Sequence, residues 1–173
     1  MGLLSQAPLS GYTLRKLLTQ TPMRHYSDSP GAVYPALRRL ARKKWIAAGA
    51  PPGIRRRQEY RISSAGQAAL AAWLRRPVTR DDVIYRTKEL ILRFAFMGAV
   101  LPAQAVEHFL EEYRRETDAY SAVLRQYFEE QGASMPWTGR LAFEQGMAQY
   151  RTNAEWAQNA LIILKNHPKE SQR

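Results

Sequence analysis

A chain of 173 residues is long enough for one domain of ordinary size or for two small ones, and its net charge of +11 is unevenly distributed. Residues 1–80 hold 15 Lys or Arg against 2 Asp or Glu, a net of +13, whereas residues 81–173 hold 11 against 13, a net of −2. This charge asymmetry indicates one module that binds a polyanion and another with a different role. Because no run approaches about 18 consecutive apolar residues and no signal peptide opens the sequence, we expect a cytoplasmic protein.

Two helices are predicted at the start of the chain. Residues 2–5 are interpreted as the tail of a first helix that ends before Pro8, and Ser10 is a capping residue for a second helix. The apolar residues of this second helix are Leu14, Leu17 and Leu18. The segment after it contains Pro22 and small polar residues, so it is expected to connect to a further helix.

The next helix is predicted over residues 29–44, SPGAVYPALRRLARKK. Ser29 can accept a hydrogen bond from a first-turn amide, and Pro30 fits the first helical position. Apolar residues recur at helical spacing, at Val33, Leu37 and Leu40. Pro35 lacks an amide hydrogen, and it is expected to disturb the first turns of this helix.

The opposite face of this helix is a candidate DNA-binding surface. It carries Tyr34, Pro35, Arg38 and Arg42, with Arg39 at the flank. A basic helix face is by itself most often a solvated surface. The irregular start and the strongly basic surroundings favour a recognition helix for DNA instead.

A β-hairpin is predicted after this helix. Residues 45–48 and 58–62 form two short runs around a turn rich in Gly and Pro, and Tyr60 and Ile62 alternate with charged residues, so one face can pack on the helices. Three arginines near the tip suit contact with phosphates or the minor groove: Arg55, Arg56 and Arg57. A hairpin kept soluble by charge is the alternative.

Helices are predicted for the rest of the chain. Ser63 or Ser64 caps a helix that ends before Pro77, residues 88–97 form a short apolar helix, and Pro102 begins a long helix that extends to about residue 131. Residues spaced alternately by four and three form a packing seam on the long helix: Val106, Leu110, Tyr113, Thr117, Tyr120, Leu124 and Tyr127. A last helix from Trp137 has the same spacing in Phe143, Met147, Tyr150, Ala154, Ala157, Leu161 and Leu164.

The two seams predict contact between helices of two subunits, since two small domains would be marginal without a partner. An antiparallel hairpin within one chain is the alternative. The predicted dimerisation residues are Val106, Leu110, Tyr113, Tyr120, Leu124, Met147, Tyr150, Leu161 and Leu164.

In this order the elements resemble a winged helix-turn-helix, and four stretches resemble the PadR family of bacterial transcription regulators. LSGYTL at 9–14 is similar to the family's opening of the second helix and adds Tyr12 to the DNA-binding candidates, and SPGAVYPALRRL at 29–40 is similar to its recognition helix. RRRQEYRISSAG at 55–66 resembles the Arg-rich wing and the start of the next helix, and WL at 73–74 falls where the family often has it. Lys44 stands where the family usually has a glycine.

The second half resembles the C-terminal helical domain of longer PadR-like regulators, including the virulence activator type, in which these helices dimerise. The family's ligand-responsive members imply a pocket for a small aromatic effector, with Trp73, Tyr85 and Trp156 as candidates. The residues alone favour core packing for these rings.

Neither an enzyme nor a bound cofactor or metal is expected. The sequence has no cysteine, its three histidines are far apart, and it holds no Gly-rich phosphate loop, nucleophile elbow or recognisable acid/base pair.

The sequence therefore predicts a mainly α protein. Residues 1–76 form a winged helix-turn-helix of three helices and a two-stranded β wing, residues 77–101 a linker and short helix, and residues 102–173 a helical dimerisation domain. The predicted function is a homodimeric, nucleoid-associated regulator that binds specific double-stranded DNA, a repressor before an activator. The alternatives are a non-specific nucleic-acid architectural protein and a protein-interaction adaptor that binds no DNA.

Overall fold

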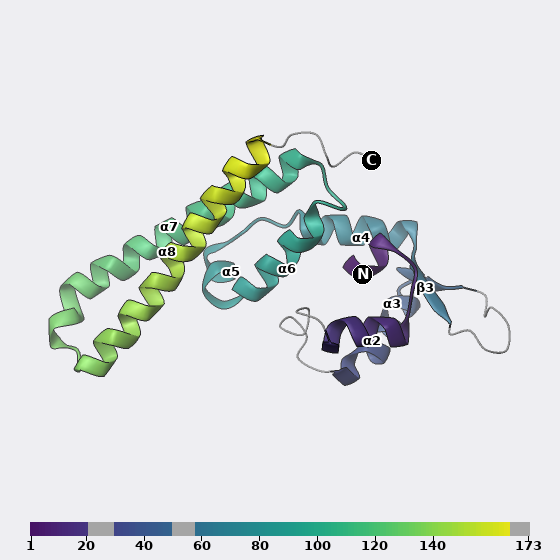
Figure 1. Ribbon diagram of the computed structural model, residues 1–173, viewed down its shortest axis with the longest axis horizontal. Coiled ribbons are helices and arrows are strands. Elements are labelled where there is room, and N and C mark those ends of the chain that lie inside the picture. The colour runs from purple at the N-terminus through teal and green to yellow at the C-terminus, as the bar shows by residue number, and fades with distance from the viewer. Residues whose placement is uncertain (21–29, 50–57, 167–173) are drawn as a thin grey trace. The chain divides into compact units, whose positions relative to one another are not determined.

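The computed structural model describes residues 1–20, 30–49 and 58–166 (Figure 1). Ser29 and the three arginines at 55–57 lie outside these ranges. The chain divides into two compact units, residues 1–76 with 95–100, and residues 77–94 with 101–173. No helix in the described ranges combines the length and the apolar character needed to cross a membrane.

The first unit is a winged helix-turn-helix, as predicted. Its elements in chain order are α1 (Gly2–Gln6), β1 (Leu9–Ser10), α2 (Gly11–Gln20), the 3₁₀ turn η2 (Pro30–Ala32), α3 (Val33–Arg42), β2 (Ile46–Ala48), β3 (Glu59–Ile62) and α4 (Ser64–Leu74). The last residues of the later helix α6 also belong to this unit.

The sheet of this unit has three antiparallel strands in the order β1-β3-β2, so the predicted two-stranded wing gains a third strand. Leu9 of β1 lies opposite Tyr60, and Ile46 of β2 lies opposite Ile62. Tyr60 and Ile62 pack against the buried core, which confirms the predicted alternation along β3. The core consists of Leu4, Leu14, Val33, Leu37 and Ile46.

The recognition helix begins later than predicted. Pro30 opens the 3₁₀ turn η2, and the α-helix starts only at Val33, with Ala32 as an N-cap that makes no side-chain hydrogen bond. A helix from Pro30 would need an amide hydrogen at Pro35, which proline lacks. With the start at Val33, Pro35 falls in the first turn, where no amide hydrogen is required.

The recognition helix ends in a left-handed residue, Lys44, whose φ of 57° is the one positive φ of a non-glycine residue in the part of the chain that the structure describes. The Lys44 amide donates to the Ala41 carbonyl at 2.9 Å, and the Trp45 amide donates to the Leu40 carbonyl at 3.0 Å. These two bonds form a Schellman motif, which usually has glycine at the left-handed position. Lys44 thus occupies a position that favours glycine.

Replacing Lys44 with Gly is expected to raise the free energy of unfolding by about 1 kcal/mol, because glycine adopts a positive φ without the steric cost that a Cβ imposes. Urea denaturation of the full chain without DNA measures this. Lys44→Ala keeps the strained backbone and serves as the control. A Gly variant no more stable than the Ala variant would show that the left-handed conformation costs nothing here.

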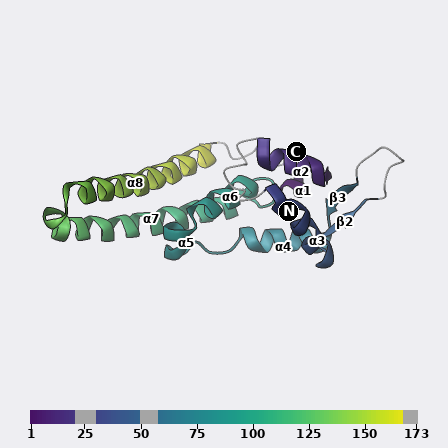
Figure 2. The same cartoon turned by 90° about the horizontal axis from the view of Figure 1, so that it is seen from below.

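The second unit is helical. Its elements are α5 (Arg80–Tyr85), most of α6 (Thr87–Met97), α7 (Ala103–Gln131), the 3₁₀ turn η3 (Gly132–Ser134) and α8 (Trp137–Asn166). The green and yellow helices α7 and α8 lie side by side and antiparallel in both views (Figures 1 and 2).

The two predicted seams pack against each other within one chain, so the alternative, an intrachain hairpin, is what the structure shows. Leu110 is 1% exposed and Leu161 5% exposed without any second subunit. The rings of Tyr120 and Tyr150 meet edge to face at 5.0 Å between centroids. The short connection between the helices explains this, because short links join antiparallel neighbours. Dimerisation through the seam residues stays a prediction.

Helix α5 lies in the segment predicted as a linker, and it was missed. A capping box starts it: the Asp82 amide donates to the Thr79 hydroxyl at 3.3 Å, and Asp82 Oδ2 accepts from the Thr79 amide at 3.0 Å. Asp82 Oδ1 also accepts from Arg86 Nε at 2.7 Å. Burial raises the pKa of Asp82, but the hydrogen bonds from Thr79 and Arg86 outweigh it, and the pKa lies below its ordinary value.

Replacing Asp82 with Asn is expected to lower the free energy of unfolding by about 1 kcal/mol at pH 7, since it weakens the capping box and removes an ion pair. Because the folded pKa is lowered, the advantage of Asp82 is complete above about pH 4 and disappears as the pH falls through the lowered pKa. Urea denaturation between pH 7 and pH 3 measures it, with the exposed Asp81→Asn as the matched control. A difference that does not change with pH would contradict this role of the carboxylate.

Candidate nucleic-acid interface

The exposed face of α3 carries a row of guanidinium groups. Val33 and Leu37 are buried in the core, and this orientation leaves Arg38, Arg39 and Arg42 exposed to solvent. None of the three arginines forms an ion pair with another described residue. Their charge is therefore available to an external anion.

A shallow groove of about 520 Å³ follows this face. It is lined by Pro35, Arg38, Arg39, Ala41 and Arg42. Tyr34 lies one position before Pro35 and is 45% exposed. The structure thus brings together all the predicted DNA-binding residues of α3 on one surface.

The start of α2 fixes the position of Tyr34. A Cβ on Gly11 would lie 2.7 Å from a ring carbon of Tyr34 and 3.3 Å from a methyl of Leu37, so a side chain at this position would displace the Tyr34 ring. Ser10 caps α2 by accepting from the Thr13 amide at 3.1 Å, as predicted. Tyr12 follows on the first turn and is exposed. Three consecutive residues therefore have different roles: Ser10 caps α2, Gly11 leaves room for the Tyr34 ring, and Tyr12 exposes its own ring.

The end of α3 is tied to the start of α4. The Ser63 hydroxyl donates to the Lys44 carbonyl at 2.6 Å and accepts from the Gly66 amide at 3.0 Å, which confirms Ser63 as the cap. A Cβ on Gly66 would lie 1.9 Å from the Trp45 carbonyl oxygen. The hydrogen bonds of Ser63 and the absence of a side chain at Gly66 thus hold the end of α3 close to the start of α4.

The family model described as "Transcriptional regulator PadR-like family" matches residues 1–72. Residues 1–72 are therefore similar to this family. The resemblance found in the sequence is confirmed, and the family is one of transcription regulators. The match includes α1, both strands of the wing, the whole of α3 and most of α4.

Solved structures resemble the chain over nearly its full length. A PadR-like transcriptional regulator from Bacillus cereus is 23% identical, with a TM-score of 0.44, and the alignment covers 95% of this chain and 94% of that one. Bacillus subtilis PadR in complex with operator DNA is 20% identical, with a TM-score of 0.41, covering 94% and 93%. The same protein in complex with p-coumaric acid is 20% identical, with a TM-score of 0.41, covering 95% and 91%. No curated protein matches the sequence.

Two basic residues of this segment were not among the DNA-binding candidates predicted from the sequence. Arg61 lies on the outer face of β3 and is exposed, and the Lys43 ammonium lies 4.4 Å from the centre of the Trp45 ring. The alternation along β3 was the signal for Arg61. The predicted contacts by Ser29 and by the arginines at 55–57 lie outside the described residues and stay predictions.

The three candidate effector-pocket residues have different surroundings. Trp156 packs edge to face against Phe94 at 5.1 Å and Tyr113 at 5.7 Å between centroids, which is the core role favoured by the residues alone. Burial raises the pKa of Tyr113 to about 12. Tyr85 is exposed at the end of α5, and Trp73 is half-buried on α4. A pocket built from the three candidates stays a prediction.

Within the described ranges, no three side chains of His, Asp or Glu come together in a way that could hold a metal ion.

Proposed function

We propose that the protein is a homodimeric transcription regulator that recognises a specific operator through α3. The observation that carries this proposal is the row of arginines at 38, 39 and 42, exposed along one groove and without carboxylate partners among the described residues. The major groove of DNA admits an α-helix, and a guanidinium can bond both N7 and O6 of guanine. The net charge of +13 on residues 1–80 supplies general attraction to phosphates.

The other parts of the PadR-like domain have distinct roles in this proposal. Tyr12 and Tyr34 flank Gly11 and face the DNA backbone or bases near the start of α3. The three arginines at 55–57 contact phosphates or the minor groove, which adds affinity without choosing a sequence. Repression by occupation of a promoter is the proposed mode, in the cytoplasm, with a small aromatic molecule as the effector.

Selection of fragments from genomic DNA by the purified protein tests the function. Sequencing should show enrichment of one motif with two half-sites related by two-fold symmetry, about one helical turn or a multiple of it apart. Enrichment of longer fragments without any shared sequence motif would contradict sequence-specific recognition and favour the architectural alternative.

The dimer in this proposal uses side chains that the intrachain hairpin leaves exposed, in place of the buried part of the seam. Val123 and Tyr127 lie four residues apart on the same face of α7 and are 48% and 50% exposed. Aromatic side chains of this kind are enriched at protein interfaces. We infer that this face of α7 contacts a second copy.

The double variant Val123→Asp with Tyr127→Asp is expected to be a folded monomer, because it places carboxylates in the proposed contact. Within the hairpin it removes one ring contact, the stacking of Tyr127 on Phe143 at 5.6 Å between centroids. Sedimentation gives the oligomeric state, and circular dichroism checks the helix content. Ala122→Asp adds a carboxylate to another exposed face of α7 and should leave the dimer intact. A double variant that sediments as the wild-type dimer would exclude this face as the interface.

A further inference from the structure

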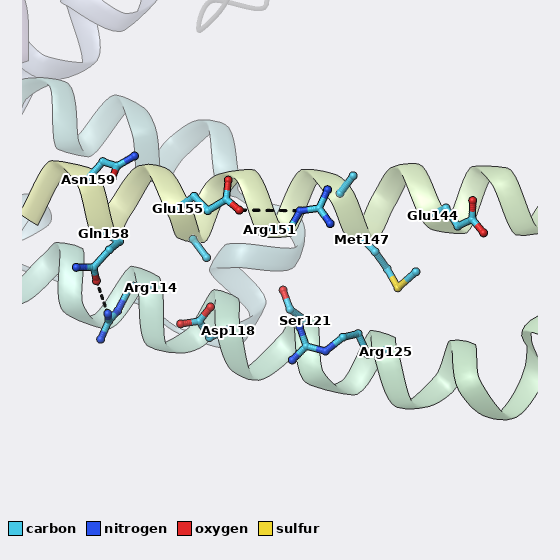
Figure 3. A pocket seen from close by; sticks show the side chains of 12 residues that line it. Arg114, Asp118, Ser121, Arg125, Glu144, Met147, Arg151, Glu155, Gln158 and Asn159 are labelled. Atoms are coloured by element: carbon cyan, nitrogen blue, oxygen red, sulfur yellow. Dashed lines mark hydrogen bonds and ion pairs between the residues drawn. The ribbon is translucent and has the colours of Figure 1, made fainter.

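A charged groove of about 790 Å³ runs between α7 and α8 in the second unit (Figure 3). This volume is in the range of small-molecule sites, about 300 to 1,000 Å³. Its charged side chains are three arginines and three carboxylates: Arg114, Arg125, Arg151, Asp118, Glu144 and Glu155. Because the charges balance, the groove suits neither a polyanion nor a polycation, and it suits a ligand that carries one charge of each sign.

Four of these charged groups are already bonded within the chain. Arg151 and Glu155 form an ion pair along α8, with 4.0 Å between Arg151 Nε and Glu155 Oε1 (Figure 3). Arg114 donates to Gln158 across the groove, between α7 and α8. Glu144 accepts from Arg140 Nε at 3.1 Å along α8. Asp118 and Arg125 are the two charged lining residues that these contacts do not include.

The middle of the groove holds polar groups without partners. The side chains of Asp118 and Arg125 form no ion pair or hydrogen bond with any part of the chain that the structure describes. The Ser121 hydroxyl is buried and also lacks a hydrogen-bond partner among the described residues. A buried hydroxyl without a partner carries a cost in free energy unless a ligand or water bonds it.

These three groups lie on one face of α7, at spacings of three and four residues. The Arg125 side chain runs back along α7 toward Ser121 (Figure 3). Met147 extends from α8 toward α7 in the same region and offers an apolar surface (Figure 3).

We propose that the middle of this groove binds a free α-amino acid. The ligand carboxylate accepts from the Arg125 guanidinium and the Ser121 hydroxyl, the ligand ammonium donates to the Asp118 carboxylate, and the ligand side chain lies against Met147. An α-amino acid carries both charges on neighbouring atoms, which matches an unpaired cation and an unpaired anion in one groove. A carboxylic acid alone or an amine alone would leave one of the two protein charges unpaired.

Titration of the full-length protein with each of the twenty common L-amino acids tests this, by isothermal calorimetry and by thermal unfolding. At least one amino acid should bind saturably and raise the unfolding temperature. The corresponding acid without the amine, the corresponding amine without the acid, and inorganic phosphate are the comparison probes, and all three should bind at least tenfold more weakly.

Three variants locate the site. Asp118→Asn and Arg125→Gln should each weaken amino-acid binding about tenfold or more, and Ser121→Ala should weaken it less. Glu129→Gln removes an exposed charge from the same helix outside the groove lining and should bind as wild type. Circular dichroism melts without ligand verify that each variant is folded.

Two results would overturn the proposal. One is the absence of binding by all twenty amino acids at millimolar concentration. The other is binding of phosphate or of the acid alone as tightly as the amino acid and undiminished in Asp118→Asn, which would make the groove an anion site. Operator binding is measured without ligand, so neither result bears on the proposed DNA-binding function.

Discussion

Replacing Arg38 with Ala is expected to weaken operator binding by about 1 to 3 kcal/mol, roughly 5- to 150-fold, with a much smaller effect on a random duplex. Arg38 is exposed on α3, lines its groove, and has no carboxylate partner in the described ranges, so the variant removes no intramolecular ion pair. A guanidinium that bonds guanine distinguishes bases, and its loss therefore reduces specificity. Fluorescence anisotropy with both duplexes at one salt concentration measures the two affinities.

The wing arginines supply the contrast for this experiment. Replacing Arg55, Arg56 and Arg57 together with Ala should weaken binding to both duplexes equally and reduce the salt dependence by roughly one unit of slope per lost phosphate contact. Equal losses on both duplexes for Arg38→Ala would instead assign that side chain to phosphate contact. Base discrimination by a guanidinium of α3 would then depend on Arg39 or Arg42.

Replacing Gly66 with Ala is expected to lower the free energy of unfolding by about 3 kcal/mol or more. The new methyl group would meet the Trp45 carbonyl oxygen at 1.9 Å, and a backbone atom cannot move aside as the end of a flexible side chain can. The start of α4 would have to separate from the exit of α3, which also disturbs the bond from Ser63 to Lys44. The gain in helix propensity from Gly to Ala, about 1 kcal/mol, is too small to compensate.

Urea denaturation followed by circular dichroism measures the loss. Gly98→Ala is the matched control in the same unit, because nothing lies within 4 Å of the position of its Cβ. Wild-type stability in the Gly66 variant would mean that α4 can shift from Trp45 at little cost. The close approach would then not be what fixes the end of the recognition helix.

The long helices were predictable because each repeats an apolar pattern over several turns. The missed elements are too short for such a pattern, since β1 has two residues and α5 has six. A signal for α5 was present in Thr79 and Asp82, which have the spacing of a capping box. The spacing along α7 and α8 shows that a face is buried, but it does not say which helix covers it. Leu110→Asp or Leu161→Asp would therefore bury a carboxylate between α7 and α8 and destabilise the hairpin itself.

The face of α3 was predictable because Val33 and Leu37 orient the helix and leave the arginines outside. Two other features depend on contacts between distant segments, and no local pattern shows them. The position of Tyr34 depends on the missing side chain of Gly11, and the groove of the hairpin depends on the register of α7 against α8. The resemblance to the family marked Lys44 as a glycine position, and its φ of 57° gives the physical reason.

Competition between one selected operator and a random duplex of equal length, at matched salt, tests the central claim most directly. The full-length wild-type protein should prefer the operator by about a thousandfold or more, as sequence-specific regulators do. Equal affinity for the two duplexes, with the same dependence on salt, would contradict sequence-specific recognition through α3.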